Sequence, residues 1–313
     1  MSKMSRTRKS SFNFATIFAL LKQTGAEWIE DKAPQLGAAL AYYAVFSLAP
    51  MILLLLAVVG ILFHNDTAGA WKKITEQMSY FLDKSAVDVV QGIAQQASTP
   101  ARTAFATVTG IVLALFGATG VFGQLQDALN TIWGVKPKPG GGVWGFIRSR
   151  FLSFAMLGGV GFLLLISLVV EGVLKIFSHY IQSFLPGGLV VAIVIYLVFD
   201  FAVVVTLFAI IFKILPNAIT RWGDVWIGAT LTALLFLLGK WALGLYLASG
   251  SAASAYGAAS SLITLLLWIY YSSQILLFGA EFTQVYANRL GSPVKPDKYA
   301  VPTVQREVER PAH

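Results

Sequence analysis

Residues 188–212 read GLVVAIVIYLVFDFAVVVTLFAIIF, and this stretch decides the class of fold. Its one charged side chain is Asp200. An α-helix of about 20 mostly apolar residues is long enough to cross the hydrocarbon core of a bilayer. Five further stretches meet the same criterion, near residues 37–62, 104–122, 151–174, 225–248 and 259–286. The sequence therefore predicts an all-α membrane protein with six transmembrane helices.

The composition of the whole chain agrees with a membrane environment. Of its 313 residues, 57% are hydrophobic and 12% are charged, with a mean hydropathy of +0.71. Soluble domains carry about a quarter charged residues, so a soluble globular fold is excluded. The chain has no cysteine, which excludes disulfides, thiolate nucleophiles and cysteine-ligated metals. The net charge of +8 is spread beside the apolar spans rather than in one patch, so we expect no nucleic-acid partner.

The distribution of basic residues predicts the topology. Seventeen Lys and Arg residues lie on one side of the predicted spans and five on the other. Basic loops are retained in the cytoplasm, so this excess places both termini there in a bacterial inner membrane. The segments on the basic side are 1–36, 123–150, 213–224 and 287–313.

The chain divides into three predicted parts. The cytoplasmic segment 1–36 includes an amphipathic helix over 12–32, which we expect on the inner leaflet. The membrane domain covers 37–290 and includes a periplasmic loop, 63–103, with helical spacing of apolar residues. This loop either forms one or two amphipathic helices against the leaflet or over a cavity, or is a solvated loop packed on the bundle. Residues 136–142, KPKPGGG, mark a turn, and the proline-rich tail 291–313 is expected to be disordered.

Charged side chains within the predicted spans are candidates for a substrate pathway. An ionisable group in hydrocarbon is costly, so it usually pairs with a partner or lines a water-filled path. Asp200 and Lys240 lie at similar depth in the fourth and fifth spans and can pair. Such a pair either fixes the helix register or belongs to a permeation path. Glu281, near a helix end, is a further pathway candidate, although pairing with a basic loop residue is the alternative.

The first span combines aromatic and small residues with a proline. Pro50 removes a helical hydrogen bond and predicts a bend. Tyr42 and Tyr43 carry hydroxyl groups about one turn inside the predicted inner boundary, where they need polar partners. Both tyrosines are therefore pathway candidates.

The end of the second span has two repeating patterns. Glycines recur every third residue, at Gly117, Gly120 and Gly123. They form either a stripe for close helix packing or a hinge. Three polar residues follow at the same spacing, Gln124, Asp127 and Asn130. They would form a polar face at the cytoplasmic end of this span, suited to gating or to contact with a solute. Between the fifth and sixth spans, the small uncharged segment around Gly257 is a candidate re-entrant or unwound segment.

Several motifs in order give a resemblance to a known family. They are Ala38–Tyr43 with Ser47–Pro50, Gly117–Trp133, Asp224–Ala229, Ala253–Ala259 and Leu276–Phe282. With these motifs, residues 20–290 resemble the YihY/BrkB family of bacterial inner-membrane proteins, once described as ribonuclease BN. The resemblance implies a six-helix membrane fold. The names used in the family include virulence or serum-resistance factor, transporter and nuclease.

Three hypotheses for the function follow. The first is a transporter or flippase-like protein for a small solute or a lipid-related amphiphile, with membrane lipids as partners and no cofactor. The second is a non-transporting envelope scaffold that docks a protein partner on the 63–103 segment. A metal-dependent ribonuclease is the third, and it is disfavoured because the three histidines, His64, His179 and His313, are not paired at ligand spacing. We therefore expect no enzyme activity and no metal site.

Overall fold

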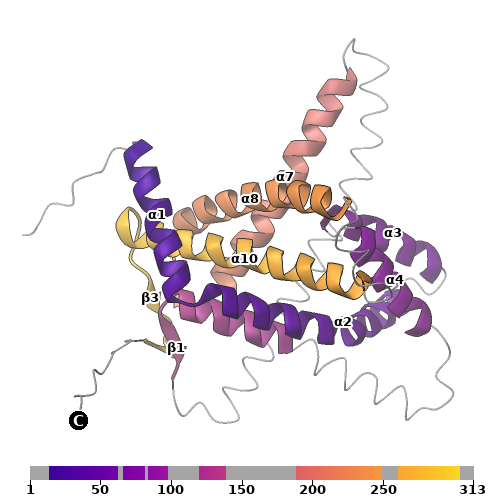
Figure 1. Ribbon diagram of the computed structural model, residues 1–313, viewed down its shortest axis with the longest axis horizontal. Coiled ribbons are helices and arrows are strands. Elements are labelled where there is room, and N and C mark those ends of the chain that lie inside the picture. The colour runs from indigo at the N-terminus through magenta and orange to yellow at the C-terminus, as the bar shows by residue number, and fades with distance from the viewer. Residues whose placement is uncertain are drawn as a thin grey trace, which may run out of the picture.

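The arrangement of the helices and strands comes from a computed structural model, which describes residues 14–62, 66–81, 84–97, 120–138, 188–248 and 260–303. Most of these residues are helical (Figure 1). The predicted spans near 104–122 and 151–174 lie outside the described residues, apart from 120–122. Most of the predicted unwound segment around Gly257 also lies outside them.

Four of the predicted spans coincide with long helices. These are α2 (Ala33–Leu62), α7 (Gly188–Ile214), α8 (Trp222–Ala248) and α10 (Ser260–Arg289). Within the described residues, three helices are long and apolar enough to cross a membrane, over Leu197–Ile214, Trp222–Tyr246 and Leu262–Arg289. The fold is therefore a mostly helical membrane fold. The count of six spans and the cytoplasmic position of both termini stay predictions.

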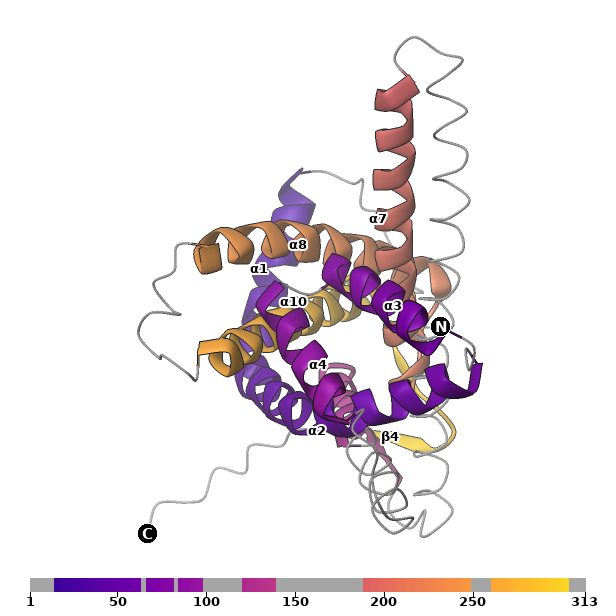
Figure 2. The same ribbon diagram turned by 90° about the vertical axis from the view of Figure 1, so that its right-hand side faces the viewer.

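The helix α10 is the centre of the packing. It lies between α2 and α8, and α7 packs on α8 (Figures 1 and 2). The N-terminal helix α1 (Phe14–Glu30) contacts one end of α10. The first half of α7 projects beyond this group and leaves apolar side chains such as Val190 and Leu197 63% exposed in the absence of lipid. Such exposure is what a helix surrounded by hydrocarbon presents.

The 63–103 segment contains two helices. They are α3 (Thr67–Phe81) and α4 (Lys84–Ala97). α4 packs on α2 and on the end of α10 opposite α1 (Figure 1). Val90 and Ala94 of α4 are buried together with Ile52 of α2. The apolar face of α4 is therefore used in packing on the bundle.

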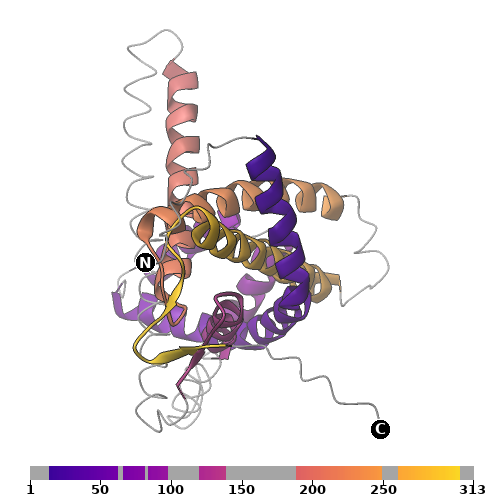
Figure 3. The ribbon, with the colours of Figure 1, turned by 90° about the vertical axis from the view of Figure 1, so that its left-hand side faces the viewer.

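Two short antiparallel strand pairs lie at the same end of the molecule as α1 (Figures 1 and 3). β1 (Val135–Pro137) pairs with β4 (Ala300–Pro302), and β2 (Ala218–Ile219) pairs with β3 (Lys295–Pro296). The prediction of a disordered tail from Gly291 is wrong for residues 291–303. The tail is held by backbone hydrogen bonds, such as 2.8 Å from the Thr303 N–H to the Gly134 carbonyl. Residues 304–313 lie outside the described residues.

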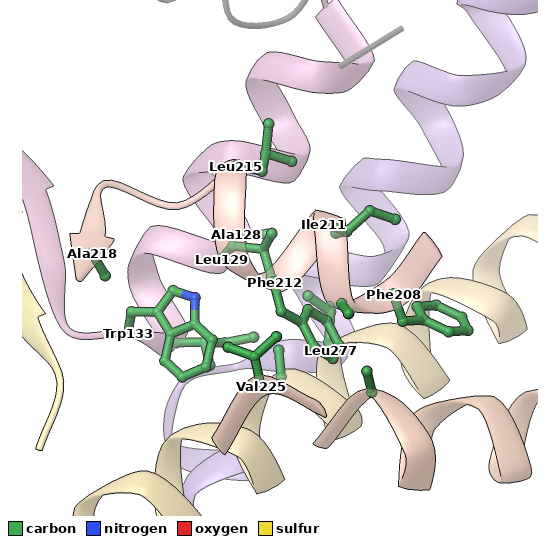
Figure 4. Close-up of a cluster of buried hydrophobic side chains, with 14 of the residues drawn as sticks. Ala128, Leu129, Trp133, Phe208, Ile211, Phe212, Leu215, Ala218, Val225 and Leu277 are labelled. Atoms are coloured by element: carbon green, nitrogen blue, oxygen red, sulfur yellow. The ribbon is translucent and has the colours of Figure 1, made fainter. Parts of the chain in front are cut away.

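The largest apolar cluster joins the helix over residues 120–132 to α7, α8 and α10 (Figure 4). Phe212 of α7 is fully buried in it, as are Leu129 and Leu215, which directly follows α7. Val225 of α8 and Leu277 of α10 complete its centre. This cluster fixes the end of the bundle that carries the strands.

Candidate functional site

One face of α10 carries polar side chains inside the bundle. Gln274, Glu281 and Gln284 are separated by seven and three residues, which places them on one side of a helix. We call these three residues the polar stripe. Glu281 is 0% exposed and is among the largest fully buried side chains. Both polar atoms of the Gln274 side chain and Oε1 of Gln284 are buried without a hydrogen-bond partner in the described residues.

The opposite face of α10 is fixed against α8 by small residues. Gly228 of α8 lies against Thr283 of α10, and Gly279 of α10 lies against Thr232 of α8. Each threonine hydroxyl donates to the glycine carbonyl one turn before it, at 2.7 Å from Thr232 to Gly228 and 2.6 Å from Thr283 to Gly279. We call this arrangement the glycine–threonine contact. Because small residues let helix backbones approach closely, the contact turns the polar stripe away from α8.

The helix α2 approaches the first residue of the polar stripe. A side-chain carbon at Gly37 would collide with the amide group of Gln274, whose Cδ would lie 3.0 Å away. The absence of a side chain at position 37 therefore makes room for Gln274. Gly37 stands in a segment with small residues, as close packing between membrane helices requires.

The helix α1 covers the middle of the polar stripe. Leu20 of α1 is buried against Phe282, Val285 and Tyr286 of α10. After Glu30 the chain reverses through Lys32, whose φ of 55° is in the left-handed region. This turn places Asp31 beside α10 and starts α2 at the buried Ala33.

The carboxyl groups of Asp31 and Glu281 lie within hydrogen-bond reach of each other. Both oxygens of Glu281 are buried, and no described residue donates a hydrogen bond to either of them. Two carboxyl groups can share a hydrogen bond only when one of them is protonated. Burial raises the pKa of Asp31 from 3.8 to about 6, the hydrogen bond with Glu281 opposes this rise, and the nearby Glu30 and Glu27 carboxylates add to it.

The predicted pair of Asp200 and Lys240 lies on two packed helices. Asp200 is on α7 and Lys240 on α8, and both side chains are half-buried. The carboxylate of Asp200 is close enough to act electrostatically on the Lys240 ammonium. Their part in a substrate pathway stays a prediction.

The three polar residues predicted to form one face after the second span lie in different environments. Oδ1 of the buried Asn130 accepts a hydrogen bond of 2.8 Å from the backbone N–H of Asn217. Its neighbour Gln126 donates one of 3.0 Å to the Leu215 carbonyl. Asn130 therefore helps to fasten this helix to the connection between α7 and α8, whereas Asp127 is exposed and Gln124 half-buried.

The candidates on the first span point partly outward. Tyr42 is 59% exposed and packs on Phe46, with 4.6 Å between the ring centroids. Tyr43 lies against Gly120, whose hypothetical side-chain carbon would be 3.4 Å from its ring. This supports the packing interpretation of Gly120. α2 is assigned as one helix through Pro50.

Two of the three glycines predicted as a stripe can be located. Gly120 packs as described, and a side-chain carbon at Gly123 would meet no atom within 4 Å among the described residues. Gly117 and Gly257 lie outside the described residues.

The sequence analysis missed Asp31, Gln274 and Gln284. The signal for the two glutamines was their spacing from Glu281 in an otherwise apolar helix. In the part of the chain that is described, no group of three or more His, Asp or Glu side chains could hold a metal ion. The three histidines lie outside that part.

These helices and the buried polar stripe define a multi-pass α-helical membrane protein. The chain belongs to the family described as virulence factor BrkB, which matches residues 24–302. This confirms the resemblance inferred from the motifs. No solved structure matches the chain.

Relatives of the chain are described only as membrane proteins. A UPF0761 membrane protein of Tolumonas auensis is 26% identical over 81% of this chain and 80% of its own length. One of Pseudomonas aeruginosa is 29% identical over 81% of this chain, and one of Stenotrophomonas maltophilia is 26% identical over 86%. The chain spans 59% and 61% of these last two relatives, less than two thirds of their length. The family and the apolar helices agree with a multi-pass protein of the bacterial inner membrane.

Proposed function

We propose that the protein is an inner-membrane transporter or flippase-like protein for a small solute or a lipid-related amphiphile. The observation that supports it most is the polar stripe, in which Glu281 is 0% exposed and Gln274 has no hydrogen-bond partner among the described residues. In this proposal the polar stripe forms part of the transport path and the protein is a carrier rather than an enzyme.

The energetics of the polar stripe favour this role over a purely structural one. A buried polar group without a partner costs about 1–3 kcal/mol. An apolar side chain at position 274 would avoid that cost, and α10 is otherwise rich in leucine and isoleucine. Polar groups kept inside a membrane bundle despite this cost are typical of substrate or ion pathways.

The scaffold alternative loses part of its support. It places the docked partner on the amphipathic 63–103 segment. Val87, Val90 and Ala94 of α4 are instead buried, and α4 packs on α2 and α10. A partner would have to use the more polar surface of α3 and α4.

A transport assay with purified protein in vesicles tests the proposal. Vesicles of phosphatidylethanolamine and phosphatidylglycerol would be loaded with the wild type, Gln274→Leu or Gln95→Leu. Movement would be followed for fluorescent phosphatidylglycerol and for a panel of radiolabelled sugars, amino acids and organic acids. Gln95 is exposed on α4, so its variant is a matched control for the loss of an amide.

We expect at least one probe to move with the wild type and with Gln95→Leu. Gln274→Leu should slow that movement by about tenfold, which corresponds to the loss of about one hydrogen-bonding contact. If no probe moves with the wild type, or if Gln274→Leu is as fast as the control, the proposal is wrong.

A further inference from the structure

The carboxyl groups near the polar stripe form a graded series from solvent to the interior. Glu30 is exposed at the end of α1, Asp31 is half-buried in the following turn, and Glu281 is fully buried. Asp31 and Glu281 lie within hydrogen-bond reach. These carboxyl groups therefore extend from the solvent to the interior of the bundle.

Among the described residues, the charges that act on Glu281 are all carboxylates. They belong to Asp31, Glu27 and Glu30, which all come from α1 and its following turn. α2 has no Asp, Glu, Lys or Arg along its length. α10 and the helices that pack around it have other charged residues on or next to their described parts. None of these is among the charges that act on Glu281, and they are Lys22, Lys32, Lys84, Asp88, Arg221, Asp224, Lys240 and Arg289.

This arrangement requires a cation to be bound. Two ionised carboxylates in contact repel each other, and burying one of them without a basic partner is unfavourable. In the described residues, no group of three or more His, Cys, Asp or Glu side chains could hold a metal ion. A proton fits, since two carboxyl groups in contact share one hydrogen bond when one of them is protonated.

We infer that Asp31 and Glu281 hold one proton between them and exchange it with the side of the membrane on which α1 lies, so that they form the proton-coupling site of the transporter. In the protonated state the Glu281 carboxyl donates its hydrogen bond to the Asp31 carboxylate. On release, the proton passes to Asp31 and then to water beside Glu30, and Glu281 becomes a buried anion. The coupling role rests on the proposed transport function, whereas the proton site can be tested without it.

Infrared spectroscopy of the protein in lipid nanodiscs tests the proton site directly. The carbonyl band of protonated carboxyl groups would be followed from about pH 7 to pH 11 for the wild type, Glu281→Gln and Asp31→Asn. Glu76→Gln, an exposed carboxyl on α3, is the matched control. Asp200→Asn separates this site from the acidic group in the middle of α7.

We expect the wild type to lose the band of about one buried carboxyl group over this range. Glu281→Gln should lack that band, Asp31→Asn should shift its titration, and the Glu76 and Asp200 variants should keep it. Because glutamine has the shape of a protonated glutamate, Glu281→Gln also keeps the packing. A wild-type band that Glu281→Gln leaves intact, or no such band at any pH, would overturn the inference.

The vesicle assay then tests the coupling. For any probe that the wild type moves, the rate should change at least about tenfold with an imposed pH gradient, and the rate of Glu281→Gln should not depend on the gradient. A gradient-dependent rate in Glu281→Gln would overturn the coupling role. No movement by the wild type, together with a normal infrared titration, would instead refute the transport function and leave the proton site standing.

Discussion

The glycine–threonine contact allows the packing behind the polar stripe to be tested quantitatively. In Gly228→Ala, the added carbon would lie 2.7 Å from Cβ and 3.0 Å from Cγ2 of Thr283, and closer still to its hydroxyl. Carbon atoms in contact prefer about 3.5–4.0 Å. Because Cβ is fixed to the backbone of α10, relief of this clash requires the two helices to move apart.

The size of the effect follows from a comparison within one helix. Overpacking of this kind costs about 1–3 kcal/mol. Replacing glycine by alanine inside a helix also gains about 0.5–1 kcal/mol. Gly244 lies on the same helix and has no atom within 4 Å of its hypothetical side-chain carbon. Gly228→Ala should therefore be less stable than Gly244→Ala by about 1–3 kcal/mol, because the gain in helix propensity is common to both.

Reversible unfolding in mixed micelles measures this difference. Helix content would be followed by circular dichroism as a denaturing detergent is added to each variant. The double variant Gly228→Ala with Thr283→Ala removes the colliding side chain and should recover most of the loss, which makes the two changes strongly non-additive. Thr283→Ala alone loses the 2.6 Å hydrogen bond to the Gly279 carbonyl and measures that separate cost.

The packing explanation can fail in two ways. Gly228→Ala could prove as stable as Gly244→Ala, or Thr283→Ala could bring no recovery to it. Either result would show that α8 and α10 do not approach each other as closely as the structure indicates.

Three further perturbations test other parts of the structure. Because the pKa of Asp31 is raised from 3.8 to about 6, the folded chain binds this proton more tightly than the unfolded chain. The free energy of unfolding should therefore rise as the pH falls from about 7 to 4.5, and Asp31→Asn should reduce that rise in micelle titrations. Lys32→Gly should raise the free energy of unfolding by about 1 kcal/mol, since it relieves a φ of 55°, and a decrease would contradict this. Asn130→Leu should cost about 1–3 kcal/mol and speed hydrogen exchange at the Asn217 amide, and unchanged exchange would contradict the role of that bond.

The positions of the long helices could be predicted from the sequence because the bilayer imposes a simple requirement. A spanning helix must satisfy its own backbone hydrogen bonds and present apolar side chains over about 20 residues. The predicted stretch 188–212 matches α7 at Gly188–Ile214, and 225–248 matches α8 at Trp222–Ala248. The apolar spacing in 63–103 likewise predicted α3 and α4.

The strand pairs could not be predicted in the same way. β2 and β3 have two residues each, which is too short to show an alternating pattern. Their partners come from distant parts of the chain, as in the pairing of Ala218 with Pro296. Prolines in the tail indicated disorder, yet proline is compatible with a short edge strand because it needs no hydrogen bond on its outer side.

Asp200 and Glu281 show what depth alone can and cannot predict. Asp200 and Lys240 lie on consecutive helices joined by a short connection, so a similar depth was enough to predict that they approach each other. Glu281 was expected to meet a basic loop residue, but among the described residues the charges that act on it are carboxylates of α1 and its turn. Asp31 lies within the predicted amphipathic segment 12–32 and was not a candidate there. Which helix covers Glu281 depends on a contact between opposite ends of the chain, and helical spacing contains no information about that contact.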